Sequence, residues 1–295
     1  MNNSNIKCII CGNIKPGSDE HIIPKSLGNE VLRINTICKE CNEGLGRYVD
    51  EHLVNNFLSQ MIRLELKLKG QSKKIPNPFA RGKDSDGRDI YIDDEFRPYL
   101  PLRLEQEESK IRTIGGSQQQ AVKALKSKLK RMGKTEQDIQ ELLNNAKTRE
   151  ENYQPEVNYE IEIHQDKLLL GALKIAYEYM YQIFEEQFYK DEIAQEIRQV
   201  LYEATTGKFD RKYSGMERTP KHIIDKYRLY KDTYQNAHAL FFTKDKANQL
   251  IVNISLFWCD FLSFSICVSK DASKYNLDEN TLVIIDIVNQ QKISI

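Results

Sequence analysis

Four cysteines in the first 41 residues have the spacing of a metal site. Cys8 and Cys11 are separated by two residues, and so are Cys38 and Cys41. A two-residue gap lets a tight turn direct both sulfur atoms at one ion, and four thiolates complete the tetrahedral coordination that zinc prefers. The sequence therefore predicts one structural Zn²⁺ bound by these four residues, in preference to a redox pair or free thiols.

Three polar residues in the same stretch have the chemistry to bind a second, harder cation. Glu20 and His21 lie between the cysteine pairs, and Asn42 directly follows Cys41. Mg²⁺ and Mn²⁺ prefer oxygen ligands, which the Glu20 carboxylate and the Asn42 carboxamide can supply. His21, with an ordinary pKa of about 6.5, then stays free as a base. The alternatives are a solvated glutamate, a locally bonded histidine and an asparagine that caps a helix.

The order of these residues resembles that of the HNH endonucleases, which have the ββα-metal fold. The resemblance covers roughly the first fifth of the chain and is carried by Glu20-His21-Ile22-Ile23-Pro24, Gly28, Cys38-x-x-Cys41-Asn42, Leu45-Gly46 and Asp50. It implies that His21 is the general base that deprotonates a water. It also implies that Glu20, where aspartate is more frequent, and Asn42 bind the catalytic Mg²⁺ or Mn²⁺.

One position departs from the family pattern. Many HNH proteins have a middle asparagine nine positions before the final one, and here Arg33 stands there. Asn29 and Asn35 lie nearby, and the spacing does not decide whether either replaces it. Arg33 has the charge to contact a phosphate instead.

Composition places limits on the partners of the protein. The 295 residues contain 43 Lys+Arg and 43 Asp+Glu, so a surface that binds nucleic acid must be local. The first residues are polar and no run of eighteen apolar residues occurs, so we expect a cytoplasmic protein with no membrane partner. In that reducing compartment Cys259 and Cys267 are expected to be small buried hydrophobic residues.

The hydrophobic pattern predicts an α+β protein in three parts. Residues 1–70 would form an N-terminal zinc-bound ββα-metal (HNH) module, with strands at 7–10 and 21–23 and a helix from Asp50 to Gly70. Residues 71–90, rich in Pro, Gly and charge, would form a linker. Residues 91–295 would form a mixed helical and antiparallel-sheet C-terminal domain for recognition or regulation.

Within this last part, periodicity predicts further elements. We expect a basic helix at 117–134, a second helix capped by Thr135, a strand at 157–163 and a buried helix at 167–188. Four strands, at 237–242, 250–257, 262–268 and 282–288, would form an antiparallel sheet on that buried helix. The basic helix either presents a solvated face or contacts phosphates. His164, His222 and His238 are expected to be structural.

Together these features predict a metal-dependent HNH endonuclease acting on DNA, with RNA as the open alternative. The resemblance implies a role in bacterial restriction, anti-phage defence or a mobile element. Two other hypotheses remain: a non-catalytic zinc-dependent protein that binds nucleic acid, and a nuclease switched on by a ligand or partner protein at the C-terminal domain. A homodimer is also open, because cutting both strands needs two active sites.

Overall fold

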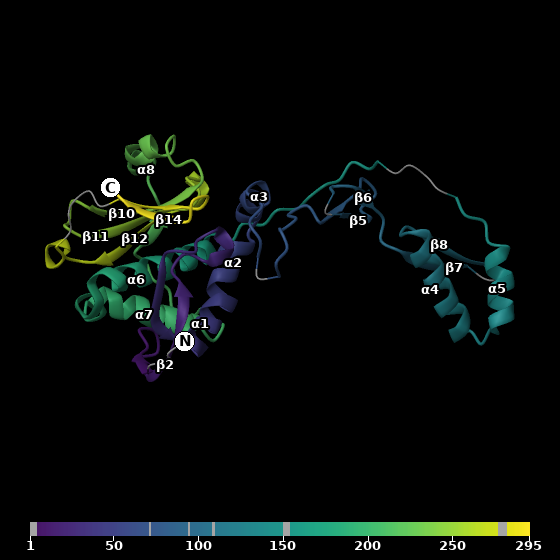
Figure 1. The fold of residues 1–295 in the computed structure, drawn as a ribbon, viewed down its shortest axis with the longest axis horizontal. Coiled ribbons are helices and arrows are strands. Elements are labelled where there is room, and N and C mark those ends of the chain that lie inside the picture. Colours follow the sequence, from purple (N-terminus) through teal and green to yellow (C-terminus); the bar gives the residue numbers. More distant parts are fainter. Residues whose placement is uncertain (1–4, 71, 94, 108–109, 150–153, 277–281) are drawn as a thin grey trace. The chain divides into compact units, whose positions relative to one another are not determined.

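The computed structural model describes residues 5–70, 72–93, 95–107, 110–149, 154–276 and 282–295 (Figure 1). The chain divides into two compact units, Met1–Pro76 with Ile163–Ile295, and Asn77–Glu162. The α+β class is confirmed. The compact units have other boundaries than the predicted ones at 70 and 90, because the N-terminal module packs on residues that follow position 162.

The N-terminal module is a three-stranded antiparallel sheet followed by helices. The strands lie in the order β1 (Asn5–Lys7), β2 (Ile14–His21) and β3 (Arg33–Cys38). The helices are α1 (Lys39–Leu45), a π-helical turn (Gly46–Asp50), α2 (Glu51–Asn55) and α3 (Phe57–Glu65). Both predicted strands were displaced: β1 ends where the first cysteine turn begins, and β2 ends at His21.

The single helix predicted from Asp50 to Gly70 was wrong in both limits. The chain is already helical from Lys39, so Asp50 lies inside a helical run and its side chain caps nothing. Asn56 interrupts the run with an extended backbone, and its side chain accepts a hydrogen bond of 3.0 Å from the Ser59 amide. This bond satisfies one of the free amides at the start of α3, which ends at Glu65.

The C-terminal part of the same unit is a six-stranded antiparallel sheet. Its strand order is β14-β13-β10-β11-β12-β9, with bounds β9 Met216–Arg218, β10 Ala237–Lys244, β11 Leu250–Ser255, β12 Ser263–Ser269, β13 Leu282–Asp286 and β14 Gln291–Ser294. Helix α8 (Lys221–Tyr227) precedes β10. The four predicted strands and their antiparallel pairing are confirmed. None of the helices in the described ranges is both long and apolar enough to cross a membrane.

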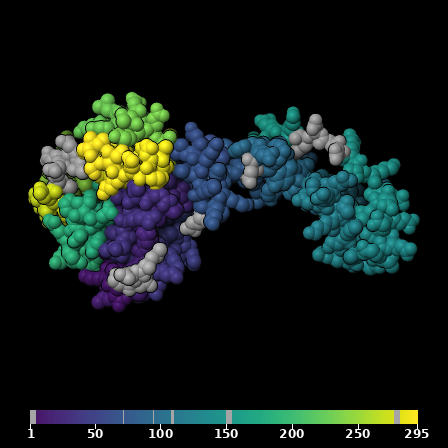
Figure 2. Space-filling view, in the orientation of Figure 1, coloured from purple at the N-terminus to yellow at the C-terminus, as the bar shows by residue number. Residues whose placement is uncertain are grey.

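Helix α6 (Gln165–Tyr189) is the buried helix predicted at 167–188, and α7 (Glu192–Ala204) follows it. Their apolar residues join the N-terminal module and the sheet in one hydrophobic core. The approach is close, since a Cβ on Gly171 would lie 3.0 Å from Leu53 Cβ and one on Gly44 only 2.4 Å from the Thr205 oxygen. In Figure 2 the purple N-terminal residues accordingly lie against the green and yellow C-terminal ones.

The second unit contains short sheets and a helix pair. Its elements are β4 (Arg81–Lys83), β5 (Asp89–Ile92), β6 (Pro98–Tyr99), β7 (Arg103–Glu107), β8 (Lys110–Ile114), α4 (Gln118–Arg131) and α5 (Glu136–Asn144). Ser117 and Thr135 cap the two helices through capping boxes, which confirms both helix predictions.

Two expectations for the second unit were not met. The strand predicted at 157–163 was wrong, because only Asn158 pairs, in a single bridge with Lys83. An alternating pattern forms a strand only when a partner strand is available. The predicted linker 71–90, whose residue 71 lies outside the described residues, contains β4 and the start of β5.

Candidate metal centre and active site

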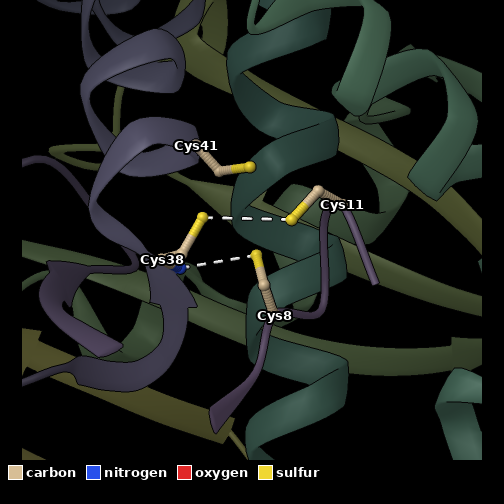
Figure 3. A group of neighbouring side chains, drawn as sticks. All are labelled: Cys8, Cys11, Cys38 and Cys41. Atoms are coloured by element: carbon tan, nitrogen blue, oxygen red, sulfur yellow. Dashed lines mark hydrogen bonds between the residues drawn. The ribbon is translucent and has the colours of Figure 1, made fainter. Parts of the chain in front are cut away.

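The four cysteines meet at one point of the N-terminal module. Cys8 and Cys11 belong to the turn between β1 and β2, Cys38 is the N-cap of α1 and Cys41 lies in its first turn (Figure 3). Their sulfur atoms all lie within 4.8 Å of one another, and those of Cys11 and Cys38 are 3.9 Å apart. Sulfur atoms around one zinc, at about 2.3 Å from the metal, lie about 3.8 Å apart. The cluster therefore fits one zinc ion.

The cluster favours a thiolate, the form that binds metal, at Cys8, while the pKa values of Cys38 and Cys41 are raised. A hydrogen bond with the Cys41 thiol lowers the pKa of the Cys8 thiol to about 4, against the opposing effect of burial. The backbone amide of Cys38 also donates to Cys8 Sγ at 3.4 Å. All six cysteines are free thiols.

His21 lies at the end of β2, opposite Arg33 of β3. Its Nε2 atom is buried and has no hydrogen-bond partner in the part of the chain that the structure describes, and it lies 3.9 Å from Glu30 Oε2. Burial lowers the pKa of His21, and the charge of Arg33 lowers it further, while Asp19, Glu20 and Glu30 oppose this. The imidazole is therefore neutral near pH 7 and able to accept a proton at an unengaged nitrogen.

Glu20 points into the protein, with an exposed fraction of 6%. Its Oε1 atom lies 2.5 Å from Nζ of Lys174, a fully buried residue of α6. Lys174 also lies 3.5 Å from Asp50 Oδ2 and 3.3 Å from Glu178 Oε2. The structure thus places Glu20 in a buried cluster of one ammonium and three carboxylates, which the sequence did not reveal.

The cluster contains more acidic groups than basic ones. Burial raises the pKa of Asp50 to about 7 and that of Glu178 well above its usual range, although Lys174 opposes both shifts. Burial alone would lower the pKa of Lys174, but the surrounding carboxylates raise it. Among the described residues, Asp50 Oδ1 and both Glu178 oxygens have no hydrogen-bond partner. The single ammonium group therefore does not satisfy all the oxygen atoms of this cluster, although Glu178 Oε2 lies 3.3 Å from it.

Asn42 lies inside α1 and does not cap it, because Cys38 is the N-cap. Its Nδ2 donates to Ser18 Oγ at 3.1 Å and to the Asp19 carbonyl at 3.3 Å, which fastens α1 to β2. The described residues donate no hydrogen bond to its Oδ1, which can therefore accept one. Gly46 follows Asn42 by four residues, on the same side of the helix. A Cβ on Gly46 would meet nothing within 4 Å, so open space lies beside this helix.

The three predicted active-site residues therefore lie on two neighbouring elements with separate contacts. Glu20 and His21 are on β2, and Asn42 is on α1, which packs against β2. Across the described residues, no hydrogen bond or ion pair joins Asn42 to Glu20 or to His21. The nearest link is the bond from Asn42 to the Asp19 carbonyl.

Asn29 is the asparagine that braces the loop between β2 and β3. Its Nδ2 donates to the carbonyls of Ile23 (2.7 Å) and Leu32 (2.9 Å), and its Oδ1 accepts from the amides of Val31 (3.1 Å) and Leu32 (2.8 Å). Its side chain is fully buried. Asn35, the other open possibility, is exposed.

Arg33, which stands at the position of the middle asparagine, is bound by carboxylates. It contacts Asp19 Oδ2 at 2.7 Å and Glu30 Oε2 at 3.3 Å. These ion pairs lie at the surface, and they leave Arg33 beside His21 at the exposed end of the hairpin.

A signal for the buried cluster is present in the sequence. Lys174 and Glu178 are four residues apart in a helix that is apolar on nearly all sides. A charged side chain in such a helix must be paired where it is buried. The sequence pattern of the helix does not identify the partners of Lys174, because Glu20 lies 154 positions away in the chain.

The β2–β3 hairpin and the helix that follows it form a ββα module, and its four cysteines form a cluster that could hold a structural metal ion. Residues 8–58 match the model of a family described as HNH endonuclease. The predicted resemblance is confirmed. A search of curated proteins and a search of solved structures each found no match.

Proposed function

We propose that this protein is a metal-dependent endonuclease that hydrolyses phosphodiester bonds in DNA. The proposal rests on one observation above all: within a module of the HNH family, the buried Nε2 of His21 is left without a hydrogen-bond partner among the described residues. An unpaired buried nitrogen is unfavourable unless something binds it. A water molecule beside a phosphate is the partner that the family's chemistry calls for.

His21 is the general base in this proposal. A water at hydrogen-bond distance from Nε2 would lose its proton to the ring as it attacks phosphorus. The lowered pKa of His21 keeps the ring neutral, and hence able to accept that proton, at neutral pH. A positioned general base contributes about 10²–10⁴-fold to a rate.

Glu20 and Asn42 would hold the catalytic Mg²⁺ or Mn²⁺. Both side chains offer oxygen, the ligand atom that these cations prefer. Lys174 engages only Oε1 of Glu20 among the described hydrogen bonds, and open space lies beside Gly46, four residues after Asn42 on α1. When bound there, a divalent cation would stabilise the charge that develops on the phosphate and on the leaving oxygen.

DNA is the proposed substrate, in the cytoplasm of a bacterium and in restriction, anti-phage defence or a mobile element. This context follows from the family resemblance of residues 8–58. The basic helix α4 supports a nucleic-acid partner, because it has five cationic residues and no acidic one between Gln118 and Arg131. Cleavage of both strands would further require two copies of the site, as in a homodimer.

Plasmid nicking tests the proposal. The full chain with its zinc is incubated with supercoiled DNA and either Mg²⁺ or Mn²⁺, and His21→Ala is compared with the parent and with His222→Ala, a change at an exposed histidine. We expect His21→Ala to lower the rate at least about 100-fold and His222→Ala to leave it unchanged. Equal nicking by His21→Ala would reject the assigned base, and preferential cleavage of an RNA substrate would reject DNA.

A further inference from the structure

We propose that Lys174 of helix α6 is a positioning residue of the nuclease site, holding the end of β2 that presents His21. The inference rests on the proposed function and adds a residue from outside the HNH stretch. Lys174 Nζ donates to the carbonyl of His21 at 2.9 Å and to that of Ile22 at 3.3 Å, besides Glu20 Oε1 at 2.5 Å. Lys174 Nζ thus bonds three consecutive residues of one segment, and it makes a longer bond of 3.5 Å to Asp50 Oδ2.

Two more side chains of α6 hold backbone carbonyls of the same module. Tyr177 donates from its hydroxyl to the carbonyl of Ile9, in the first cysteine turn, at 2.8 Å. Gln182 donates to the carbonyl of Arg33, which pairs with His21 across the hairpin, at 2.7 Å. Helix α6 therefore contacts three parts of the module: the first cysteine turn, the end of β2 at His21 and the start of β3 at Arg33.

Packing alone does not account for a lysine at this position. Lys174 has no exposed surface, and removing an ammonium group from water is costly even when carboxylates surround it. Apolar residues of similar volume often replace a buried ion pair with no loss of stability. What an apolar side chain could not do is donate hydrogen bonds to the carbonyls of His21 and Ile22.

The consequence for the reaction is geometric. The Lys174 hydrogen bonds fix the backbone of His21 and Ile22, and they orient the carboxylate of Glu20. A base must lie within about 0.5 Å of its productive position, and a displacement of about 1 Å can lower a rate about 100-fold. Residues 163–295 therefore complete the catalytic geometry, in addition to any part they take in recognition.

The test separates positioning from folding. Lys174→Met removes the donors but leaves three buried carboxylates without their cation, so its stability is expected to fall. In Lys174→Met/Glu178→Gln one of those carboxylates is also neutralised, and Glu178 has no contact with β2 among the described hydrogen bonds and ion pairs. Lys190→Met, at the exposed C-cap of α6, is the control.

We expect the double variant to stay folded with the parent's zinc content but with a lower melting temperature, because Glu20 and Asp50 remain buried without their cation. Its KM for plasmid should be unchanged and its kcat lowered about 100-fold. Lys190→Met should behave as the parent. A kcat equal to the parent's in this folded, zinc-loaded variant would overturn the inference, because Lys174 would then act only through stability.

Hydrogen exchange supplies a readout that does not depend on cleavage. The amide of Ile22 donates to the Leu32 carbonyl at 3.1 Å, next to the segment that Lys174 holds. Its exchange should be at least tenfold faster in the double variant, while Lys190→Met leaves it unchanged. Unchanged exchange at Ile22 would overturn the positioning role. A parent protein that cuts no DNA would instead reject the proposed function and leave the exchange result to decide the role of Lys174.

Discussion

The Nε2 atom of His238 donates a hydrogen bond of 3.0 Å to the carbonyl oxygen of Leu27, which joins β10 to the loop that follows His21. The direction of this bond is fixed by the other ring nitrogen, since Nδ1 accepts from the Phe257 amide at 3.3 Å. Nδ1 therefore has no proton and Nε2 has one. A charged ring would turn an N–H group toward the Phe257 amide and break that contact.

The first prediction concerns acid stability. Burial lowers the pKa of His238 to about 4, against the effect of the Leu27 bond. In the unfolded chain the His238 imidazole has a pKa of about 6.5, so it binds a proton at a higher pH than in the folded protein. The stability due to neutral His238 is therefore complete above about pH 6.5 and is lost progressively down to about pH 4. Between pH 7.5 and 5.5 we expect the titration of His238 to lower the free energy of unfolding by about 1.4 kcal/mol.

Urea unfolding at both pH values measures this contribution. His238→Phe should reduce the loss of unfolding free energy on acidification by about that amount, because it removes the titrating group. The exposed His222→Ala serves as the control and should retain the loss seen in the parent. An identical pH dependence in His238→Phe would show that His238 is not buried in its neutral form.

The second prediction concerns zinc. Cys41→Ser should lower the metal content from one zinc per chain to a small fraction and lower the melting temperature, because the cysteine turn and the start of α1 would no longer be joined. Zinc binding contributes about 10–16 kcal/mol in isolated finger peptides. Elemental analysis gives the stoichiometry, with Cys267→Ser as a matched control distant from the cluster. A full zinc content in Cys41→Ser would exclude the four-thiolate site.

The third prediction concerns the loop brace. Asn29→Ala removes a side chain that satisfies four backbone bonds, and we expect it to destabilise the protein by about 3 kcal/mol. Asn35→Ala, at an exposed position of the same hairpin, should change the stability by less than about 0.5 kcal/mol. Urea unfolding of the two variants compares them. Equal stability of the two would mean that Asn29 does not hold the loop.

These residues also show which parts of the fold could be predicted from the sequence. The cysteine cluster was predictable because its members occur in two local pairs, each with the two-residue spacing that brings two sulfur atoms together. The four strands of the C-terminal sheet were predictable because β-branched and aromatic residues are concentrated in them. In both cases the determining information lies within a few residues of the chain.

The unpredicted features depend on contacts between distant parts of the chain. Asp50 was expected to begin a helix, but Cys38 had already begun one, so the same aspartate faces a buried lysine. The 157–163 segment has the alternation of a strand but finds only one bridge, at Asn158. Lys174 meets Glu20 across 154 positions, and nothing in the local pattern of either residue identifies the other.

The final prediction concerns helix α4 of the second unit. Four arginines in the hairpins of that unit are neutralised by carboxylates, in the pairs Arg81–Asp89, Arg88–Asp84, Arg97–Asp93 and Arg112–Glu105. On α4 only Lys130 has such a partner, Glu136, within the described part of the chain. Lys123 and Lys126 lie three residues apart on α4, and no carboxylate of the described residues pairs with either. These unneutralised charges are suited to DNA phosphates, whose counterions they would displace.

Fluorescence anisotropy with duplex DNA, in the absence of divalent cations, tests this surface. Lys123→Glu/Lys126→Glu should weaken binding at least about tenfold at low salt, and should reduce the slope of log K against log salt concentration by about 2. Lys208→Glu/Lys231→Glu changes the net charge equally at exposed sites of the other unit and should have a small effect. If both double variants weakened binding equally, net charge and not helix α4 would govern the affinity for DNA.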